Sequence, residues 1–413
     1  MNFLLHSLCY ALMFVPNLEH AQQCYQQFSS PTFLTEEKNL QHRLKQLKTS
    51  FPSSTKFYYA IKANYNPYIV SLLKQEGLDG IDTVSPYEIK LAKKLGFDHS
   101  QIVFTGCASD THELQAVKNE GVLLNLGSLS ELSSYVKLFP NSDLSLRINP
   151  GMGDGENDKV ITAGEDAKFG ILQQDLNTAF ELCKKNNITI VGLHMHLGSG
   201  LYQSDIFAKA LNHMFSLAKT LPSLKFVDLG GGFGVRHQLQ QKQIDLNSFS
   251  EVLQQQLAHH KLNHLEIRFE PGKFLVAEST ALICKVNVVK NLPNKQCLIM
   301  DSGFNHLVRP SFYQSYHEII NLSRPHENCV PTKIEGYLCE SGDEFHPNLN
   351  FPKSQEGDYL AILSSGAYGS SMSSLYNFRP YAAEAMITDN GTLKACRQPE
   401  NFEKIWDGMG WLW

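Results

Sequence analysis

The chain has 413 residues, and 42% of them are hydrophobic, which suits a globular protein with two cores and excludes a disordered one. Its 36 basic and 41 acidic residues are interspersed and give a net charge of −5, so the sequence does not favour a nucleic-acid partner. The nine cysteines form no CxxC pair and no Cys/His ligand spacing, which argues against a disulfide framework and against structural zinc. We therefore predict a cytoplasmic protein that acts on a small molecule.

The N-terminus holds the one candidate for a targeting segment, the apolar stretch FLLHSLCYALMFV (3–15). No Lys or Arg precedes it, no A-x-A cleavage pattern follows it, and it is too short to span a bilayer. We predict that residues 1–30 form an N-terminal segment packed on a β domain, without a membrane partner.

From residue 55 to about 270, short β-rich runs alternate with amphipathic stretches of helical period. Parallel strands need such crossover helices, and eight of these units are what a (β/α)8 barrel requires. We predict a TIM-like barrel over residues 31–270, with a doubly wound open sheet as the alternative, because periodicity does not reveal closure. The predicted strands are residues 55–61, 80–84, 101–106, 122–127, 143–148, 188–196, 224–230 and 264–270.

After residue 270 the pattern changes to alternating β-like runs such as ALICKVNVV (281–289) and DYLAIL (358–363), separated by turn-rich segments. This pattern predicts a mostly-β C-terminal domain over residues 271–413. The predicted fold class is therefore α/β, a barrel followed by a β domain.

The active groups of such a barrel lie where the strands end, at the C-terminal face. Taken singly, each candidate has a structural explanation: a lysine that reaches solvent, a salt-bridged rim residue, a satisfied core histidine or a strand-to-loop turn. Their joint placement favours a site. The residues at or just past a predicted strand end are Lys62, Asp82, Arg147, His196, Gly230 to Gly232 and Glu270.

These residues fit the needs of a phosphorylated pyridine cofactor. Lys62 ends the apolar run FYYAIK, where burial would disfavour the ammonium and free the amine for a Schiff base. LGGGFG (229–234) offers backbone N–H groups to a phosphate, and Ser199 can donate to it as well. His196 can lie against an aromatic ring. Glu270 can face the pyridine nitrogen, where an anion favours the electron-accepting pyridinium.

Six motifs in this order give the chain a family resemblance over about residues 30–387: YAIKAN, HMHLGSG, DLGGGFG, EPGK, CESGD and GAYG. The chain resembles the alanine-racemase-fold (fold-type III) PLP-dependent decarboxylases. Within them it is most similar to the diaminopimelate decarboxylases, through LRINPG, KFGI, DSGFNHLVRPSFYQSYHEI, CESGD and GAYGSSMSSLYNFRP.

The resemblance implies a cofactor site for pyridoxal 5′-phosphate with no metal. Lys62 would carry the cofactor as a Schiff base, His196 would stack on its ring, and Glu270 would hold its nitrogen. The other cofactor-binding residues would be Asp82 and Arg147, and, around the phosphate, Ser199, Gly231, Gly232 and Tyr368.

The resemblance also implies a homodimer with shared active sites. Cys339 would reach in from the partner subunit and protonate the carbanion left after CO2 departs. The alternative for this cysteine is a buried structural thiol, the commonest fate of a free cysteine.

The implied reaction is the conversion of meso-2,6-diaminopimelate to L-lysine and CO2, in lysine biosynthesis. Glu340 would take the distal ammonium, and Arg309 with Tyr313 would clamp the distal carboxylate, with Tyr368 also at the substrate. Without its motif, Arg309 could equally be half of a surface ion pair. Lys273 would also contact substrate, but it stands in EPGK where the family usually has EPGR, and a point charge does not replace a planar fork.

Several alternatives remain open. The changes at EPGK, at SSGAYG, at RPYAAEA and after CESGD allow a related decarboxylase acting on another carboxylated amino acid or a siderophore intermediate. An amino-acid racemase shares the barrel logic but would use a tyrosine base in place of Cys339. A noncatalytic PLP-binding regulatory protein would usually have lost Lys62, Glu270 or Cys339, which this chain keeps.

Overall fold

The structure is a computed structural model that describes residues 13–153, 155, 162–164 and 167–410. It divides into two compact units. The barrel unit holds Arg43–Val235 and Gln243–Phe274. The β unit holds the N-terminal part through His42, Arg236–Lys242 and the chain from Leu275 onward.

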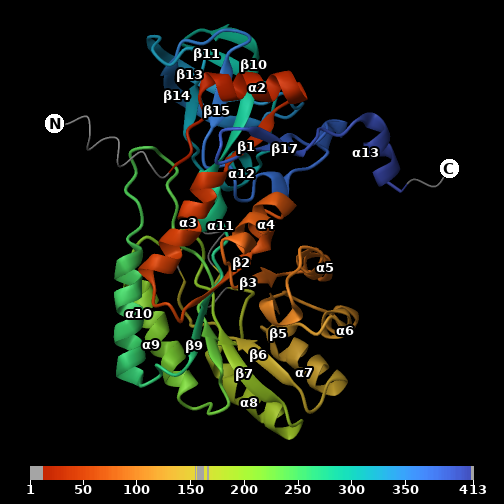
Figure 1. Ribbon diagram of the computed structural model, residues 1–413, viewed down its shortest axis with the longest axis vertical. Coiled ribbons are helices and arrows are strands. Elements are labelled where there is room, and N and C mark those ends of the chain that lie inside the picture. Colours follow the sequence, from red (N-terminus) through yellow and green to blue (C-terminus); the bar gives the residue numbers. More distant parts are fainter. Residues whose placement is uncertain (1–12, 154, 156–161, 165–166, 411–413) are drawn as a thin grey trace. The chain divides into compact units, whose positions relative to one another are not determined.

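The barrel unit contains a closed barrel of eight parallel strands (Figure 1). Pairing of the first strand with the last, with Phe57 opposite Phe269, closes it, so the alternative of an open sheet is wrong and the predicted barrel is confirmed. The strands are β2 (Lys56–Ala60), β3 (Gly80–Thr83), β4 (Ile102–Phe104), β5 (Leu123–Leu126), β6 (Asp143–Arg147), β7 (Thr189–His194), β8 (Phe226–Asp228) and β9 (Glu266–Phe269).

Helices connect these strands and surround them in Figure 1. Their starts are marked by side chains that accept backbone N–H groups, such as Ser85, Asp110 and Ser128, which satisfy donors that a helix leaves free. The connecting helices are α4 (Pro67–Gln75), α5 (Pro86–Lys94), α6 (Thr111–Asn119), α7 (Leu129–Leu138), α8 (Leu176–Lys185), α9 (Asp205–Ala218) and α10 (Leu246–His260).

Aromatic side chains pack against the strands where the barrel closes. The Phe57 and Phe269 rings stack with centroids 6.1 Å apart, and Phe51 lies 4.9 Å from Phe269. Phe233 contacts Phe269 at 5.3 Å and Phe249, on α10, at 5.7 Å. Burying such rings supplies much of the apolar area that stabilises a core.

The β unit contains a nine-stranded sheet in the order β14-β13-β11-β10-β1-β16-β17, with β15 joining β10 to β12. The predicted β domain is confirmed, but the first strand, β1, precedes the barrel in the chain and was not predicted. It pairs with β10 and β16. The strands are β1 (Thr32–Glu36), β10 (Thr280–Leu292), β11 (Lys295–Met300), β12 (Ile319–Asn321), β13 (Cys329–Glu335), β14 (Glu344–Pro352), β15 (Tyr359–Ile362), β16 (Ala383–Ile387) and β17 (Leu393–Arg397).

The helix α2 (Leu18–Phe28) covers part of this sheet, since its buried residues Ala21, Cys24 and Phe28 share a hydrophobic core with Leu34 and Ile283. The other helices of the described residues are α3 (Glu37–Ser50), α11 (Lys273–Val276), α12 (Arg309–Tyr313) and α13 (Phe402–Gly408), with 3-10 turns η1 (Ile61–Ala63), η2 (His99–Gln101), η4 (Gln173–Asp175), η5 (Ala277–Ser279), η6 (Ser370–Met372) and η7 (Tyr376–Phe378).

The apolar N-terminal stretch lies mostly outside the described residues, which begin at residue 13. Across the part of the chain that is described, no helix combines the length and the apolar character needed to cross a membrane.

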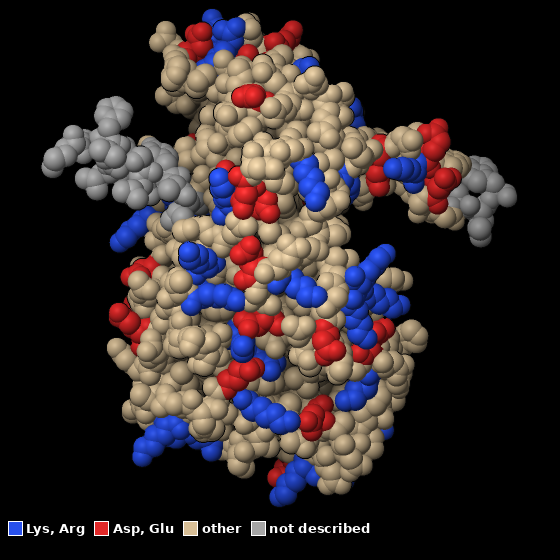
Figure 2. Space-filling model, in the orientation of Figure 1, with Lys and Arg blue, Asp and Glu red and all other residues tan. Residues whose placement is uncertain are grey.

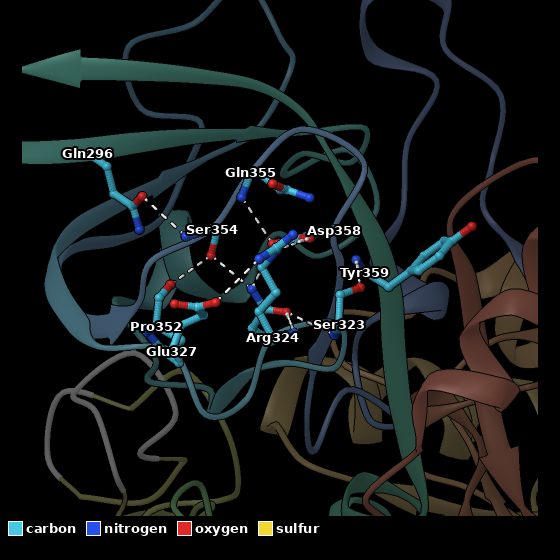
Figure 3. Close-up of polar contacts among 10 residues, drawn as sticks. Gln296, Ser323, Arg324, Glu327, Pro352, Ser354, Gln355, Asp358 and Tyr359 are labelled. Carbon is cyan, nitrogen blue, oxygen red and sulfur yellow. Dashed lines mark hydrogen bonds and ion pairs between the residues drawn. The ribbon is translucent and has the colours of Figure 1, made fainter.

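A polar network fixes the loops beside β15 in the β unit (Figure 3). Asp358 is buried and accepts hydrogen bonds from Asn321 at 3.1 Å and from the Gln355 N–H at 3.0 Å, while Arg324 pairs with its other oxygen at 3.3 Å. Asn321 also donates to Ser354 at 2.9 Å. These partners satisfy a buried charge, so the network is structural.

Surface charges of both signs alternate over the face drawn in Figure 2, as the interspersed sequence leads one to expect. The blue and red side chains lie next to each other there and form no extended area of one sign.

Candidate active site

Polar side chains from several strands meet at the carboxyl ends of the barrel strands. Parallel pairing places Arg147 opposite His194 and His194 opposite Asp228, each at the last position of its strand. Glu270 directly follows β9, and Lys62 lies in the turn η1 just after β2. The strand register therefore gathers basic and acidic groups at one rim of the barrel, where such folds carry their active sites.

The Lys62 ammonium pairs with Asp82. Its Nζ lies 2.8 Å from Asp82 Oδ2, and the two side chains are 39% and 0% exposed. The amine is therefore paired with a buried carboxylate and partly exposed, whereas the apolar run before Lys62 predicted its desolvation. The partner is buried, so Lys62 is held at the rim and does not simply extend into solvent.

Glu270 is a buried carboxyl group with two side-chain partners. Its Oε2 lies 3.0 Å from His194 Nε2, and Thr105 donates to its Oε1 at 3.4 Å. Burial, followed by the nearby negative charge of Asp82, raises the pKa of Glu270 to about 8. A group that resists ionisation this strongly is poised to take a cationic N–H partner.

His196 is held as a neutral ring. The Gly231 N–H donates to its Nδ1 at 3.1 Å, and burial, followed by the charge of Arg147, lowers its pKa well below the usual value. An uncharged imidazole with one nitrogen fixed in this way can lie flat against an aromatic cofactor ring.

The glycine loop after β8 passes too close to other backbone for any side chain. A Cβ on Gly231 would meet the Glu270 carbonyl oxygen at 2.3 Å, and one on Gly232, whose φ is +105°, would meet the Gly198 oxygen at 2.3 Å. Only glycine fits both the space and the backbone angle. The neighbouring Ser199 is half-buried.

Arg147 is buried, and its guanidinium lies over the Phe169 ring at 4.7 Å. Burial lowers its pKa. Lys273 opens α11 and is 6% exposed, so this cation too is withdrawn from solvent.

The remaining predicted residues belong to the β unit. Cys339 is an exposed thiol, so the reading of a buried structural thiol is wrong. Its N–H donates to Asn377 at 3.1 Å, and the neighbouring Glu340 carboxylate accepts a hydrogen bond from Tyr376. The buried Asp343 shapes this loop by accepting the Leu338 N–H at 2.8 Å.

Arg309 is 3% exposed and donates to Ser315 at 3.2 Å, so the alternative of a surface ion pair is wrong. Its guanidinium lies 5.6 Å from the Tyr313 ring centroid. Tyr368 is half-buried and has a left-handed φ of +56°. Such a conformation is uncommon for a residue with a side chain and often accompanies function.

The barrel rim fits pyridoxal phosphate. Among the described residues, the buried atoms Asp82 Oδ1, Asp228 Oδ2 and Asn125 Oδ1 have no hydrogen-bond partner, and buried polar atoms normally have one. The glycine loop supplies a backbone surface without side chains, and Lys62 supplies an amine. The N–H groups of the glycine loop suit a phosphate, the Lys62 amine suits an aldehyde, and the Glu270 carboxyl group suits a ring nitrogen.

Sequence reasoning missed four residues of this rim: Thr105, Asn125, His194 and Asp228. His194 was within reach, because it precedes His196 by two residues and alternate residues of a strand face the same side. Asp228 stands in VDLGGG directly before the predicted loop. No sequence pattern pointed to Thr105 or Asn125, because their role depends on a hydrogen bond between their side chains, at 2.9 Å.

Comparisons with known proteins agree with this geometry. The family described as "Pyridoxal-dependent decarboxylase, pyridoxal binding domain" matches residues 37–277. A diaminopimelate decarboxylase of Methanothermobacter thermautotrophicus is 32% identical over 397 residues, covering 93% of this chain and 92% of the relative. One of Escherichia coli is 33% identical over 366 residues, 84% of this chain and 87% of the relative. The crystal structure of diaminopimelate decarboxylase from Helicobacter pylori complexed with L-lysine superposes with a TM-score of 0.87 at 31% identity, covering 94% of this chain and 98% of that one.

Proposed function

The chain belongs to the family of pyridoxal-dependent decarboxylases, and from this premise we propose that it binds pyridoxal 5′-phosphate and converts meso-2,6-diaminopimelate to L-lysine and CO2. The observation that carries the proposal is the barrel rim, where the Lys62 amine and the buried Glu270 carboxyl group stand at the ends of the paired strands β2 and β9. The choice of meso-diaminopimelate as the substrate rests on the names of the similar proteins.

When bound, the cofactor supplies a pyridinium ring that accepts the electron pair left at Cα as CO2 departs. Lys62 would hold the aldehyde carbon through its amine and give it up to the substrate amine. The Glu270 carboxylate would accept a hydrogen bond from the protonated ring nitrogen, and His196 would cover one face of the ring. Gly231 and Gly232 would bind the phosphate through backbone N–H groups.

Asp82, Arg147, Ser199 and Tyr368 complete the proposed cofactor set. Asp82 would orient the Lys62 amine through the contact at 2.8 Å. The buried charge of Arg147 would favour anionic groups at the rim. Ser199 and the Tyr368 hydroxyl would donate to phosphate oxygens, with Tyr368 also touching substrate.

The proton that replaces the carboxylate would come from Cys339 of the partner subunit. We propose a homodimer for this reason, and the exposure of the Cys339 thiol in the described chain supports it. The Cys339 thiol would supply this proton to Cα, and solvent would return one to the sulfur.

Substrate choice would rest on the far end of diaminopimelate, which carries an ammonium and a carboxylate. The Glu340 carboxylate would bind the ammonium, while Arg309 and Tyr313 would bind the carboxylate. Arg309 is buried, which strengthens a charge-assisted hydrogen bond relative to one made in water.

Lys273 favours one second candidate, a decarboxylase acting on another carboxylated amino acid. A buried lysine is a point charge and lacks the bidentate geometry of arginine, so Lys273 could select a different substrate group. A racemase is disfavoured because Cys339 stands where that reaction would need a tyrosine base.

An assay of CO2 release tests the proposal. The protein, loaded with pyridoxal phosphate, is incubated separately with meso-diaminopimelate, lysine, ornithine and arginine, and CO2 and amine products are measured. We expect CO2 and lysine from meso-diaminopimelate alone. CO2 from none of the four, with cofactor bound, would assign the chain to the second candidate.

A further inference from the structure

A buried histidine stands between two buried carboxyl groups at the barrel rim. His194 is 1% exposed, Asp228 is 0% exposed and Glu270 is 5% exposed. The pairing of β7 with β8 sets His194 beside Asp228, and its Nε2 lies 3.0 Å from Glu270 Oε2. One donor atom from each of the three residues lies within 4.8 Å of the other two.

Two atoms of this cluster have no hydrogen-bond partner among the described residues, His194 Nδ1 and Asp228 Oδ2. The other Asp228 oxygen accepts the Gly230 N–H at 2.9 Å, which anchors Asp228 to the glycine loop. Buried polar atoms normally have a hydrogen-bond partner, and leaving one without a partner is costly.

The charges of the cluster fix which atoms carry protons. Burial lowers the pKa of His194 to about 4, and burial together with the Glu270 charge raises the pKa of Asp228 to about 8. His194 is therefore neutral at pH 7 and Asp228 holds its proton. Glu270 ionises when a cationic N–H lies beside it, and a neutral imidazole whose Nε2 faces that carboxylate carries its hydrogen on Nε2 and donates it.

We propose that His194 is the positioning residue for Glu270: its Nε2, 3.0 Å from Glu270 Oε2, orients the carboxyl group so that the other oxygen is presented to a pyridine nitrogen, and its N–H stabilises the carboxylate once a cationic ring N–H is in place. Asp228, as the protonated neighbour, keeps a second negative charge away from this pair. The proposal rests on the proposed function, because Glu270 is the group that would face the cofactor nitrogen.

The same three residues could be taken for a metal site, but the surroundings are wrong for one. Lys62 and Arg147 both act on Glu270 as positive charges, and they would repel a further cation. The titratable and charged groups that act on the cluster are Lys62, Asp82, Arg147, His196 and Arg268.

Two substitutions of His194 with side chains of similar length distinguish a hydrogen-bond donor from a side chain that only fills the space. In His194→Gln the amide nitrogen stands as many bonds from Cβ as Nε2 does and can still donate, whereas His194→Met has similar reach and no donor. His260 is a buried imidazole in the barrel unit that faces Asn212 at 3.0 Å, so His260→Met controls for the loss of a packed ring.

The measurement is the 15N spectrum of protein loaded with pyridoxal phosphate labelled at its ring nitrogen, recorded from pH 6 to 9, together with turnover. We expect a protonated nitrogen throughout in the wild type, His194→Gln and His260→Met. In His194→Met we expect the nitrogen to lose its proton within this range and turnover to fall about 10- to 100-fold.

A protonated nitrogen in His194→Met at every pH, or an equal change in His194→Gln, would overturn the proposal. If His194→Met does not fold, the glutamine variant decides alone, since an altered nitrogen signal there contradicts the donor role. A wild-type protein without a bound-cofactor signal would instead refute the proposed function.

Discussion

Glu270 illustrates how much one side chain depends on its surroundings at this rim. In water the pKa of its carboxyl group would be about 4.5. In the barrel, burial and the charge of Asp82 oppose ionisation, while Lys62 and Arg147 favour it. The balance leaves a carboxyl group that gains most from a partner with a positive N–H group. That property suits Glu270 to bind a pyridinium, and without such a partner ionising this buried carboxyl group costs free energy.

Glu270 should therefore make the cofactor-free protein less stable as pH rises. Its pKa is raised from 4.5 to about 8, so between these values the folded chain binds a proton that the unfolded chain has lost. The stability from that proton is present below pH 4.5 and disappears as pH rises through 8, by up to about 1.4 kcal/mol per pH unit.

Urea unfolding from pH 6.5 to 8.5 measures this effect, in a range above the window in which His194 titrates. The free energy of unfolding should fall less steeply with pH in Glu270→Gln than in the wild type, because glutamine does not titrate. Parallel curves for the two proteins would contradict the raised pKa.

Glu340 should matter for one class of substrate. Glu340→Gln removes the charge proposed to bind a distal ammonium and keeps the shape, so kcat/KM for meso-diaminopimelate should fall about 10- to 100-fold. For a second, slower amino-acid substrate that lacks the distal ammonium, kcat/KM should be the same in Glu340→Gln as in the wild type. Glu327→Gln, an exposed acid paired with Arg324, serves as the control, and equal losses for both substrates would count against the role.

At the scale of elements, the strand ends and loops of the barrel could be predicted because their patterns are local. Short β-rich runs marked all eight strands, and the barrel rule then placed Lys62 and Glu270. The strand β1 was missed because its partners, β10 and β16, lie hundreds of residues away. The His194 contact with Glu270 was missed because side-chain distances follow from register, which the sequence does not reveal.

The glycine loop gives a prediction at this scale. Gly232→Ala would force a Cβ against the Gly198 oxygen, so the loop must move, and affinity for pyridoxal phosphate should fall at least about tenfold. Gly121→Ala is the matched control, since Gly121 also has a positive φ but only ordinary contacts around its Cβ.

Equilibrium titration of the cofactor absorbance measures both variants. Gly121→Ala should lose about 1 kcal/mol of stability and bind the cofactor as the wild type does. Equal affinities for all three proteins would mean that the loop does not hold the phosphate.

In the whole molecule the candidate residues fall into two units, and the proposed catalysis draws on residues of both. Lys62 and Glu270 belong to the barrel unit, while Cys339, Glu340 and Arg309 belong to the β unit. The motifs suggested both groups, and the family resemblance implied that Cys339 serves the active site of the partner subunit. We accordingly propose a homodimer in which each active site takes Cys339 from the partner subunit.

Mixing two inactive variants tests the shared site. Lys62→Ala and Cys339→Ser each disable both sites of a homodimer, but a mixed dimer keeps one intact site if Cys339 serves the partner subunit. After subunit exchange, activity should return to about a quarter of the wild-type value, because half of the dimers are mixed. Activity that stays at the level of the separate variants would place both residues in one subunit's site.

Lys62 is the residue that we propose carries the cofactor. The most direct measurement is to load the protein with pyridoxal phosphate, reduce it with borohydride and map the modified peptide by mass spectrometry. We predict a phosphopyridoxyl group on Lys62 and none in Lys62→Ala. A label on another lysine, such as Lys273, or no label at all would contradict the assignment.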